Sequence, residues 1–180
     1  MTSTTVATAA SKTVYPLAKE TISPKTCMGL LHRGPYNEIG GTFGKLFEML
    51  GSESGACAHG TMKGKVLGLY LDNPQTTQPE DLRSYAALDI TTAADDNDNK
   101  KEWPKEWENI QVGGGPAAVM TVNGSYTQLG DAWQSFGGRI VEQGWKFSTN
   151  PEHISQEMYL EMDQANESKN VTKLVMFLKE

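Results

Sequence analysis

An internal repeat constrains the fold of this chain more than any other feature of its sequence. Residues 34–40 (GPYNEIG) recur as residues 124–130 (GSYTQLG), at an offset of 90 residues (124 − 34). At the same offset Phe43 matches Trp133, and further apolar positions follow in both segments at steps of three or four residues. This spacing is typical of one face of an amphipathic helix. We therefore predict one helix in each half of the chain.

Each half also contains segments that are typical of β-strands. An apolar stretch precedes each predicted helix, and two strand-like segments follow it, which gives each half the order strand, helix, strand, strand. We expect an α+β fold in which the two halves form one antiparallel sheet, with both helices on one face and a concave ligand cleft on the other. The predicted strands are residues 27–33, 69–72 and 86–89 in the first half and residues 116–123, 158–161 and 175–178 in the second.

The domain boundaries follow from the repeat. Residues 1–20, which begin with a stretch rich in Thr, Ala and Ser, are predicted to be a flexible tail. Residues 21–180 are predicted to form a single domain, with halves at about 24–92 and about 110–180. The linker between the halves, at about 93–109, combines three aspartates with two tryptophans.

Charge and cysteine content exclude several classes of protein. The chain has 22 Asp and Glu against 16 Lys and Arg, a net charge of −6, and we expect no direct nucleic-acid binding because that requires clustered basic side chains. No stretch of about 18 apolar residues is present, so no membrane-spanning helix is expected. Cys27 and Cys57 form no Cys-x-x-Cys pair, which favours a reducing compartment and predicts a cytoplasmic location. The three histidines lack the spacing of metal ligands, so neither a metal nor a cofactor is expected.

The strand around Glu157 supplies the main candidate for a binding residue. Period-two alternation places Glu157 and Tyr159 on one face of this strand and apolar side chains such as Met158 on the other. Because the apolar face is expected to lie under the helices, Glu157, Tyr159 and, in the first half, Tyr70 are expected to point into the cleft. Gly68 matches Glu157 at an offset of 89, so the predicted cleft has a carboxylate on one side and a glycine on the other.

Other aromatic residues are predicted to lie at the cleft or in the core. Tyr36 and Tyr126 occur where a strand passes into a helix, a position from which a ring can overhang the cleft. Trp133 follows the helical spacing and is predicted to fill the core. Trp103 and Trp107 are four residues apart in the linker, and they are predicted either to cap the core or to form a lid over the cleft.

Four segments, in order along the chain, carry family motifs. They are residues 32–40 (HRGPYNEIG), residues 70–74 with 79–83 (YLDNP, PEDLR), residues 112–119 with 124–126 (VGGGPAAV, GSY) and residues 157–160 (EMYL). Together they extend from about residue 24 to the end of the sequence, and they resemble the signatures of the gyrase-inhibitor-like (GyrI-like) small-molecule-binding family. This family includes effector-binding domains of multidrug-responsive regulators.

The resemblance implies a tandem of two strand–helix–strand–strand units with a central cleft for flat, apolar and often cationic compounds. It further implies that Glu157 is a ligand-contacting acid and that Tyr36 is the tyrosine of the Gly-Pro-Tyr motif. Some stand-alone members resemble hydrolases that open the cyclopropane ring of DNA-alkylating natural products. Because the sequence contains no helix-turn-helix segment, a direct role as a regulator is not expected.

Three functions are weighed. The first is a stand-alone binding protein for a small aromatic or cationic compound of the xenobiotic or multidrug type, with cation–π contacts from the rings. The second is a hydrolase in which Glu157 acts as a general base and Tyr36 or Tyr159 donates a proton or a hydrogen bond. The third is a macromolecular inhibitor of the gyrase-inhibitor type. The ligand contacts expected for the first function are Tyr36, Tyr70, Tyr126, Glu157, Tyr159, Trp103 and Trp107; neither the ligand nor the oligomeric state is specified by the sequence.

Overall fold

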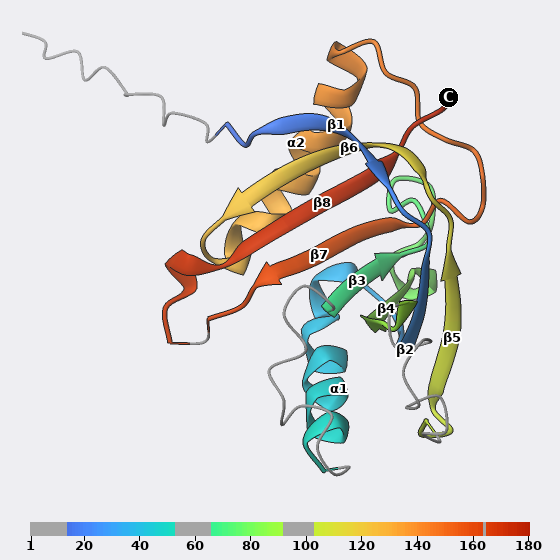
Figure 1. Cartoon of the computed structure of the whole chain (residues 1–180), viewed down its shortest axis with the longest axis vertical. Helices are drawn as coiled ribbons and strands as arrows, with labels where there is room; N and C mark the ends of the chain where they lie inside the picture. Colours follow the sequence, from blue (N-terminus) through green and yellow to red (C-terminus); the bar gives the residue numbers. More distant parts are fainter. Residues whose placement is uncertain (1–13, 53–65, 92–102, 164) are drawn as a thin grey trace, which may run out of the picture.

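The fold is built on a single sheet to which both halves of the repeat contribute strands. The computed structural model describes residues 14–52, 66–91, 103–163 and 165–180. Within these residues, eight strands form one antiparallel sheet in the order β1-β6-β8-β7-β3-β4-β2-β5 (Figure 1). The strands are β1 (Leu17–Ile22), β2 (Lys25–Arg33), β3 (Val66–Tyr70), β4 (Arg83–Asp89), β5 (Trp107–Val112), β6 (Gly115–Asn123), β7 (Ser155–Glu161) and β8 (Val171–Phe177), and the α-helices are α1 (Gly40–Ser52) and α2 (Leu129–Glu142). The predicted α+β fold with one antiparallel sheet is confirmed.

The repeat includes one strand per half that the sequence analysis missed. Strands β1 and β5 lie 90 residues apart and occupy the two edges of the sheet. Each of them pairs with the other half: β1 pairs with β6, and β5 pairs with β2 (Figure 1). The two halves are therefore interlocked, because the first strand of each half completes the sheet of the other.

The pairing of β3 with β7 at the middle of the sheet joins the two halves. In this pairing Gly68 and Glu157 are direct cross-strand partners. These two residues are also related by the repeat, at an offset of 89. A pseudo-twofold axis that exchanges the halves therefore passes between Gly68 and Glu157.

Both helices pack on the same face of the sheet. Leu46 and Leu50 of α1 and Phe136 and Ile140 of α2 are each at most 4% exposed, and they belong to one cluster with side chains of β2, β4 and β6. Burial of each such side chain stabilises the fold by about 1.5–3 kcal/mol. The predicted arrangement, with both helices on one face, is confirmed.

The opposite face of the sheet is filled by a second apolar cluster. It includes Leu67 and Leu69 of β3 together with Val119 of β6 and Val175 of β8, all at most 1% exposed. The predicted ligand cleft on this face is therefore wrong. Period-two alternation separates the two faces of a strand, but here both faces are buried. The face with Leu67 and Leu69 packs in a cluster that includes strands of the other half of the sheet, and not under a helix.

Two predicted boundaries change in the structure. Residues 17–20, predicted as part of the tail, belong to β1, and the end of the predicted linker belongs to β5, which begins at Trp107. Residues 1–13 and 92–102 lie outside the described residues. No helix in the described part of the chain is long and apolar enough to cross a membrane.

Candidate functional site

The site is centred on Glu157, which lies on the helix-covered face of the sheet and is 4% exposed. Its carboxylate accepts three hydrogen bonds. The indole N–H of Trp133 donates to Oε1 at 2.6 Å, and the hydroxyls of Tyr70 and Tyr159 donate to Oε2 at 2.7 and 2.5 Å. Within the described ranges no Lys or Arg forms an ion pair with Glu157. A buried acid is therefore held by neutral donors, which offset the cost of removing it from water.

Gly68 makes room for one of these three donors. A Cβ at position 68 would lie 3.0 Å from the hydroxyl oxygen of Tyr70 and 3.2–3.3 Å from two of its ring carbons. The Tyr70 side chain therefore folds across the glycine and reaches Glu157 on the neighbouring strand. The difference between Gly68 and Glu157, two positions related by the repeat, therefore has a structural role. The glycine leaves room for Tyr70 to donate its hydrogen bond to the acid on the neighbouring strand.

Six aromatic rings, here called the aromatic cage, are arranged around the carboxylate in two sets related by the repeat. In the first half Tyr36 contacts Tyr70 edge-on, with ring centroids 4.9 Å apart. In the second half their counterparts, Tyr126 and Tyr159, make the same kind of contact at 5.6 Å. The cage consists of Tyr36, Phe43 and Tyr70 from the first half and Tyr126, Trp133 and Tyr159 from the second.

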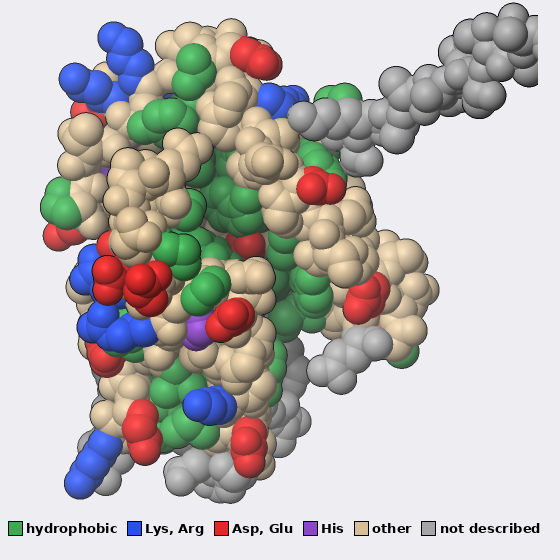
Figure 2. Space-filling view, turned by 180° about the vertical axis from the view of Figure 1, so that it is seen from behind, with side chains coloured by type: hydrophobic (Ala, Val, Ile, Leu, Met, Phe, Trp, Pro, Cys, Tyr) green, Lys and Arg blue, Asp and Glu red, His purple; other side chains and the backbone are tan. Residues whose placement is uncertain are grey.

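The helices contribute one ring each, and each ring crosses to the other half. Phe43 of α1 lies 5.4 Å from Tyr159, and its counterpart Trp133 of α2 lies 5.8 Å from Tyr70, both edge-on. The cage is therefore assembled across the pseudo-twofold axis and requires both halves. Figure 2 shows one face of the molecule hollowed near its middle, with hydrophobic side chains lining the hollow and acidic atoms at its depth.

The hydroxyls that bind Glu157 remain protonated at neutral pH. Burial, and next the charge of Glu157, raise the pKa of Tyr70 and of Tyr159 well above the usual value of 10.0. A phenolate next to a buried carboxylate would place two negative charges together, which is unfavourable. Both tyrosines therefore act as hydrogen-bond donors to the acid.

The two outer tyrosines of the cage are held very differently. The hydroxyl of Tyr36 donates to the carbonyl oxygen of Asp72 at 2.8 Å and accepts from its N–H at 2.9 Å. The Asp72 carboxylate in turn accepts from the backbone and the guanidinium of Arg83 at 2.8–3.0 Å. By contrast, Tyr126 is 38% exposed, and its hydroxyl has no hydrogen-bond partner among the described residues. Tyr36 is therefore held in place by the backbone of Asp72, whereas the hydroxyl end of Tyr126 is not held by any described residue.

This difference gives a matched pair of variants. Tyr36→Phe should lower the free energy of unfolding by about 1 kcal/mol, because it removes a hydroxyl with backbone partners. Tyr126→Phe should change it by less than about 0.5 kcal/mol, because a largely solvated hydroxyl is lost. Urea denaturation of both variants measures the two values. Equal losses would contradict the asymmetry.

The structure brings most of the predicted site residues together. Tyr36, Tyr70, Tyr126 and Tyr159 all belong to the cage around Glu157. Glu157, Tyr70 and Tyr159 lie on the helix face, however, and not on the opposite face as predicted from the polarity of the strand.

The two linker tryptophans lie elsewhere. Trp103 and Trp107 stack on each other, with centroids 5.3 Å apart, and pack on the helix-side core. Trp107 begins edge strand β5, which three strands separate from β7. Their position agrees with the core-capping alternative and gives no support to contact with a ligand at Glu157.

Trp133 is the site residue that the sequence analysis assigned to another role. It was predicted to fill the core, and its ring does contact Phe136 at 5.7 Å. Its N–H, however, donates to Glu157. A buried indole N–H needs an acceptor. The sequence placed Trp133 on the apolar face of a helix and Glu157 on a strand of the same half, and this combination could have predicted the hydrogen bond between them.

Comparison with known proteins agrees with this geometry. Residues 17–179 match the GyrI-like small molecule binding domain, and the chain belongs to this family. No curated protein matches the sequence.

Solved structures share the fold at low sequence identity. The C-terminal domain of EcmrR has a TM-score of 0.62 at 12% identity, covering 93% of this chain and 99% of that one. SAV2435 bound to tetraphenylphosphonium has a TM-score of 0.57 at 13% identity, covering 93% and 94%. A hydrolase from Listeria innocua has a TM-score of 0.51 at 10% identity, covering 91% of each chain. At these identities the similarity establishes the fold only.

Proposed function

We propose that this protein binds lipophilic organic cations inside the aromatic cage, with Glu157 as the counter-charge. The observation that carries this proposal is the buried Glu157 carboxylate, which accepts three hydrogen bonds from neutral donors and has no ion pair with Lys or Arg in the described residues. Its negative charge is thus available to a cation brought in from outside. The relative with tetraphenylphosphonium bound supports the same ligand class.

The surrounding rings suit a cation of low hydration. Ring faces attract a nearby cation by about 0.5–2 kcal/mol per contact, more where water is excluded. Both oxygens of Glu157 already accept hydrogen bonds. A ligand that needs no further acceptor, such as a phosphonium or a quaternary ammonium with aromatic groups, loses least on leaving water.

Binding requires at least one ring of the cage to move, because the rings contact one another around the carboxylate. Tyr126 is the ring with the fewest restraints, since it is 38% exposed and its hydroxyl is unpartnered among the described residues. We infer that ligands enter past Tyr126, while Tyr36 stays fixed by Asp72.

A pair of ions of nearly equal shape and opposite charge tests the proposal. In displacement titrations against the neutral triphenylphosphine oxide, tetraphenylphosphonium should bind the cage at least about 100-fold more tightly than tetraphenylborate, because a buried carboxylate repels the anion. Triphenylphosphine oxide serves as the neutral control. Equal affinity for the two ions would rule out Glu157 as a charge-selecting group.

Hydrolysis is a second candidate, favoured by the two tyrosine hydroxyls that lie within hydrogen-bond distance of Glu157. In that reaction the carboxylate would take a proton from water while a tyrosine stabilises the oxygen that gains charge as a strained ring opens. Incubation with a cyclopropane-bearing alkylating agent, followed by mass spectrometry, should then give a product heavier by one water. Unchanged substrate in the presence of saturating protein would leave binding as the function.

A further inference from the structure

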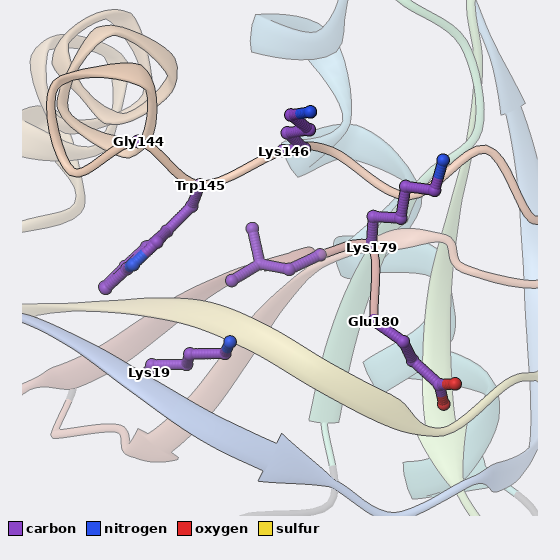
Figure 3. Close-up of a pocket in the computed structure, with 7 residues that line it drawn as sticks. Lys19, Gly144, Trp145, Lys146, Lys179 and Glu180 are labelled. Carbon is purple, nitrogen blue, oxygen red and sulfur yellow. The ribbon is translucent and has the colours of Figure 1, made fainter.

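We propose that the protein has a second binding site, for small aromatic anions, in a pocket lined by Lys19, Trp145, Lys146, Lys179 and neighbouring residues. This pocket, here called the lysine pocket, lies between the end of α2, the edge strand β1 and the segment that follows β8. Its volume is about 320 Å³, which is within the range of small-molecule sites. It is lined by Lys19, Gly144, Trp145, Lys146, Leu178, Lys179 and Glu180 (Figure 3).

The charge of the pocket differs from that of the chain as a whole. The chain carries −6, but three of the seven lining residues are lysines and one is an acid. All three lysines are exposed, and none forms an ion pair within the part of the chain that the structure describes. The neighbouring Glu20 is already bound to Lys173 at 2.9 Å. A local excess of free ammonium groups attracts an anion.

The pocket also offers a flat apolar wall. Figure 3 shows the Trp145 indole at one side, Lys19 below it, and Lys179 and Glu180 across the pocket, with the Glu180 carboxylate directed away from the indole. Leu178 is 1% exposed and lies in the lining. An aromatic ring can stack on the indole while an attached sulfonate, carboxylate or phosphate lies near Lys19, and the exposed Lys146 and Lys179 side chains, which Figure 3 shows directed away from the indole, turn toward it.

The backbone that carries these side chains is fixed by hydrogen bonds. The N–H of Lys179 donates to the carbonyl of Lys146 at 2.8 Å, so two of the lysines are held side by side. At the end of α2, Gly144 has a positive φ of 72°, and the N–H groups of Gly144 and Trp145 donate to carbonyls of the last helical turn at 2.9 and 3.2 Å. These bonds cap carbonyl groups that would otherwise weaken anion binding.

The lysine pocket and the aromatic cage should select opposite charges, so the two sites can be tested separately. Calorimetric titration with naphthalene-2-sulfonate should give saturable binding at about one site per chain, and the neutral naphthalene-2-sulfonamide should bind at least about fivefold more weakly. Lys19→Gln, Lys146→Gln and Lys179→Gln should each weaken sulfonate binding about two- to fivefold, and the triple variant more than about tenfold. Raising the salt concentration should weaken binding further.

Two controls identify the site. Lys45→Gln, which removes an exposed lysine from α1, should leave sulfonate binding unchanged. Glu157→Gln should also leave it unchanged, so loss of the proposed cation site does not affect this test. The proposal is overturned if the sulfonate does not bind, if it binds equally well to the triple variant, or if Glu157→Gln is the substitution that alters its affinity.

Discussion

Glu157→Gln should weaken the binding of tetraphenylphosphonium by about 10- to 100-fold. Gln keeps the size of the side chain but removes the charge of the carboxylate at the centre of the cage, and a charge in a site shielded from water contributes more than one at the surface. The same substitution should leave triphenylphosphine oxide binding within about threefold of wild type, since ring contacts are retained. Titration calorimetry of both compounds measures the two changes.

The control for this substitution is Glu48→Gln, which removes one charge from the exposed side of α1. It should leave both affinities unchanged, because an exposed charge is screened by salt. Thermal unfolding of Glu157→Gln should also be recorded, since the new amide has one accepting oxygen in place of two and cannot accept from Trp133 and both tyrosines at once. An unchanged affinity for the cation in a folded Glu157→Gln protein would remove the acid from the proposed function.

Gly68→Ala should destabilise the fold by about 1–2 kcal/mol and disturb the cage. The added methyl group would lie 3.0 Å from the Tyr70 hydroxyl, so the ring must shift away from Glu157. The lost hydrogen bond to a charged group costs about 1.5–3 kcal/mol. Part of this is offset by about 0.4–1 kcal/mol, because alanine restricts the unfolded chain more than glycine does. Urea denaturation measures the net change.

Two further variants isolate the cause. Gly44→Ala lies in α1 with nothing within 4 Å of the added Cβ, and it should stabilise the protein by about 0.5–1 kcal/mol. In a Tyr70→Phe background the penalty of Gly68→Ala should shrink, because the hydrogen bond that it breaks is already absent. The same penalty in both backgrounds would place its origin away from the Tyr70–Glu157 contact.

Much of the architecture was predictable because the same sequence pattern occurs in both halves of the chain. The six predicted strands and both helices are present, since each half supplied an independent copy of the signal. The edge strands β1 and β5 were missed because each pairs with one neighbour only and belongs to the other half's part of the sheet. A local sequence pattern carries little information about such a distant exchange.

The site was predicted in part. Glu157 and the tyrosines were predicted as ligand contacts, and the structure groups them in one cage. The predicted side of the sheet was wrong, because alternation distinguishes two faces of a strand without indicating what covers each. Strand β7 is buried on both, with Gln156 at 0% and Glu157 at 4% exposure. The usual expectation is that the polar face of a strand is exposed to solvent. It fails here because Glu157 accepts a hydrogen bond from Trp133 of α2 and can therefore be buried under the helices.

The meeting of Gly68 and Glu157 across the central strand pair has a consequence for how such a site can arise. If two identical half-length chains associated in this geometry, whatever stood at this position would occur twice, face to face. Two glycines would give a cage without charge, and two glutamates would repel each other strongly enough that one would have to bind a proton. A lone acid at the centre therefore requires two halves that differ in sequence, and in this protein one chain supplies both.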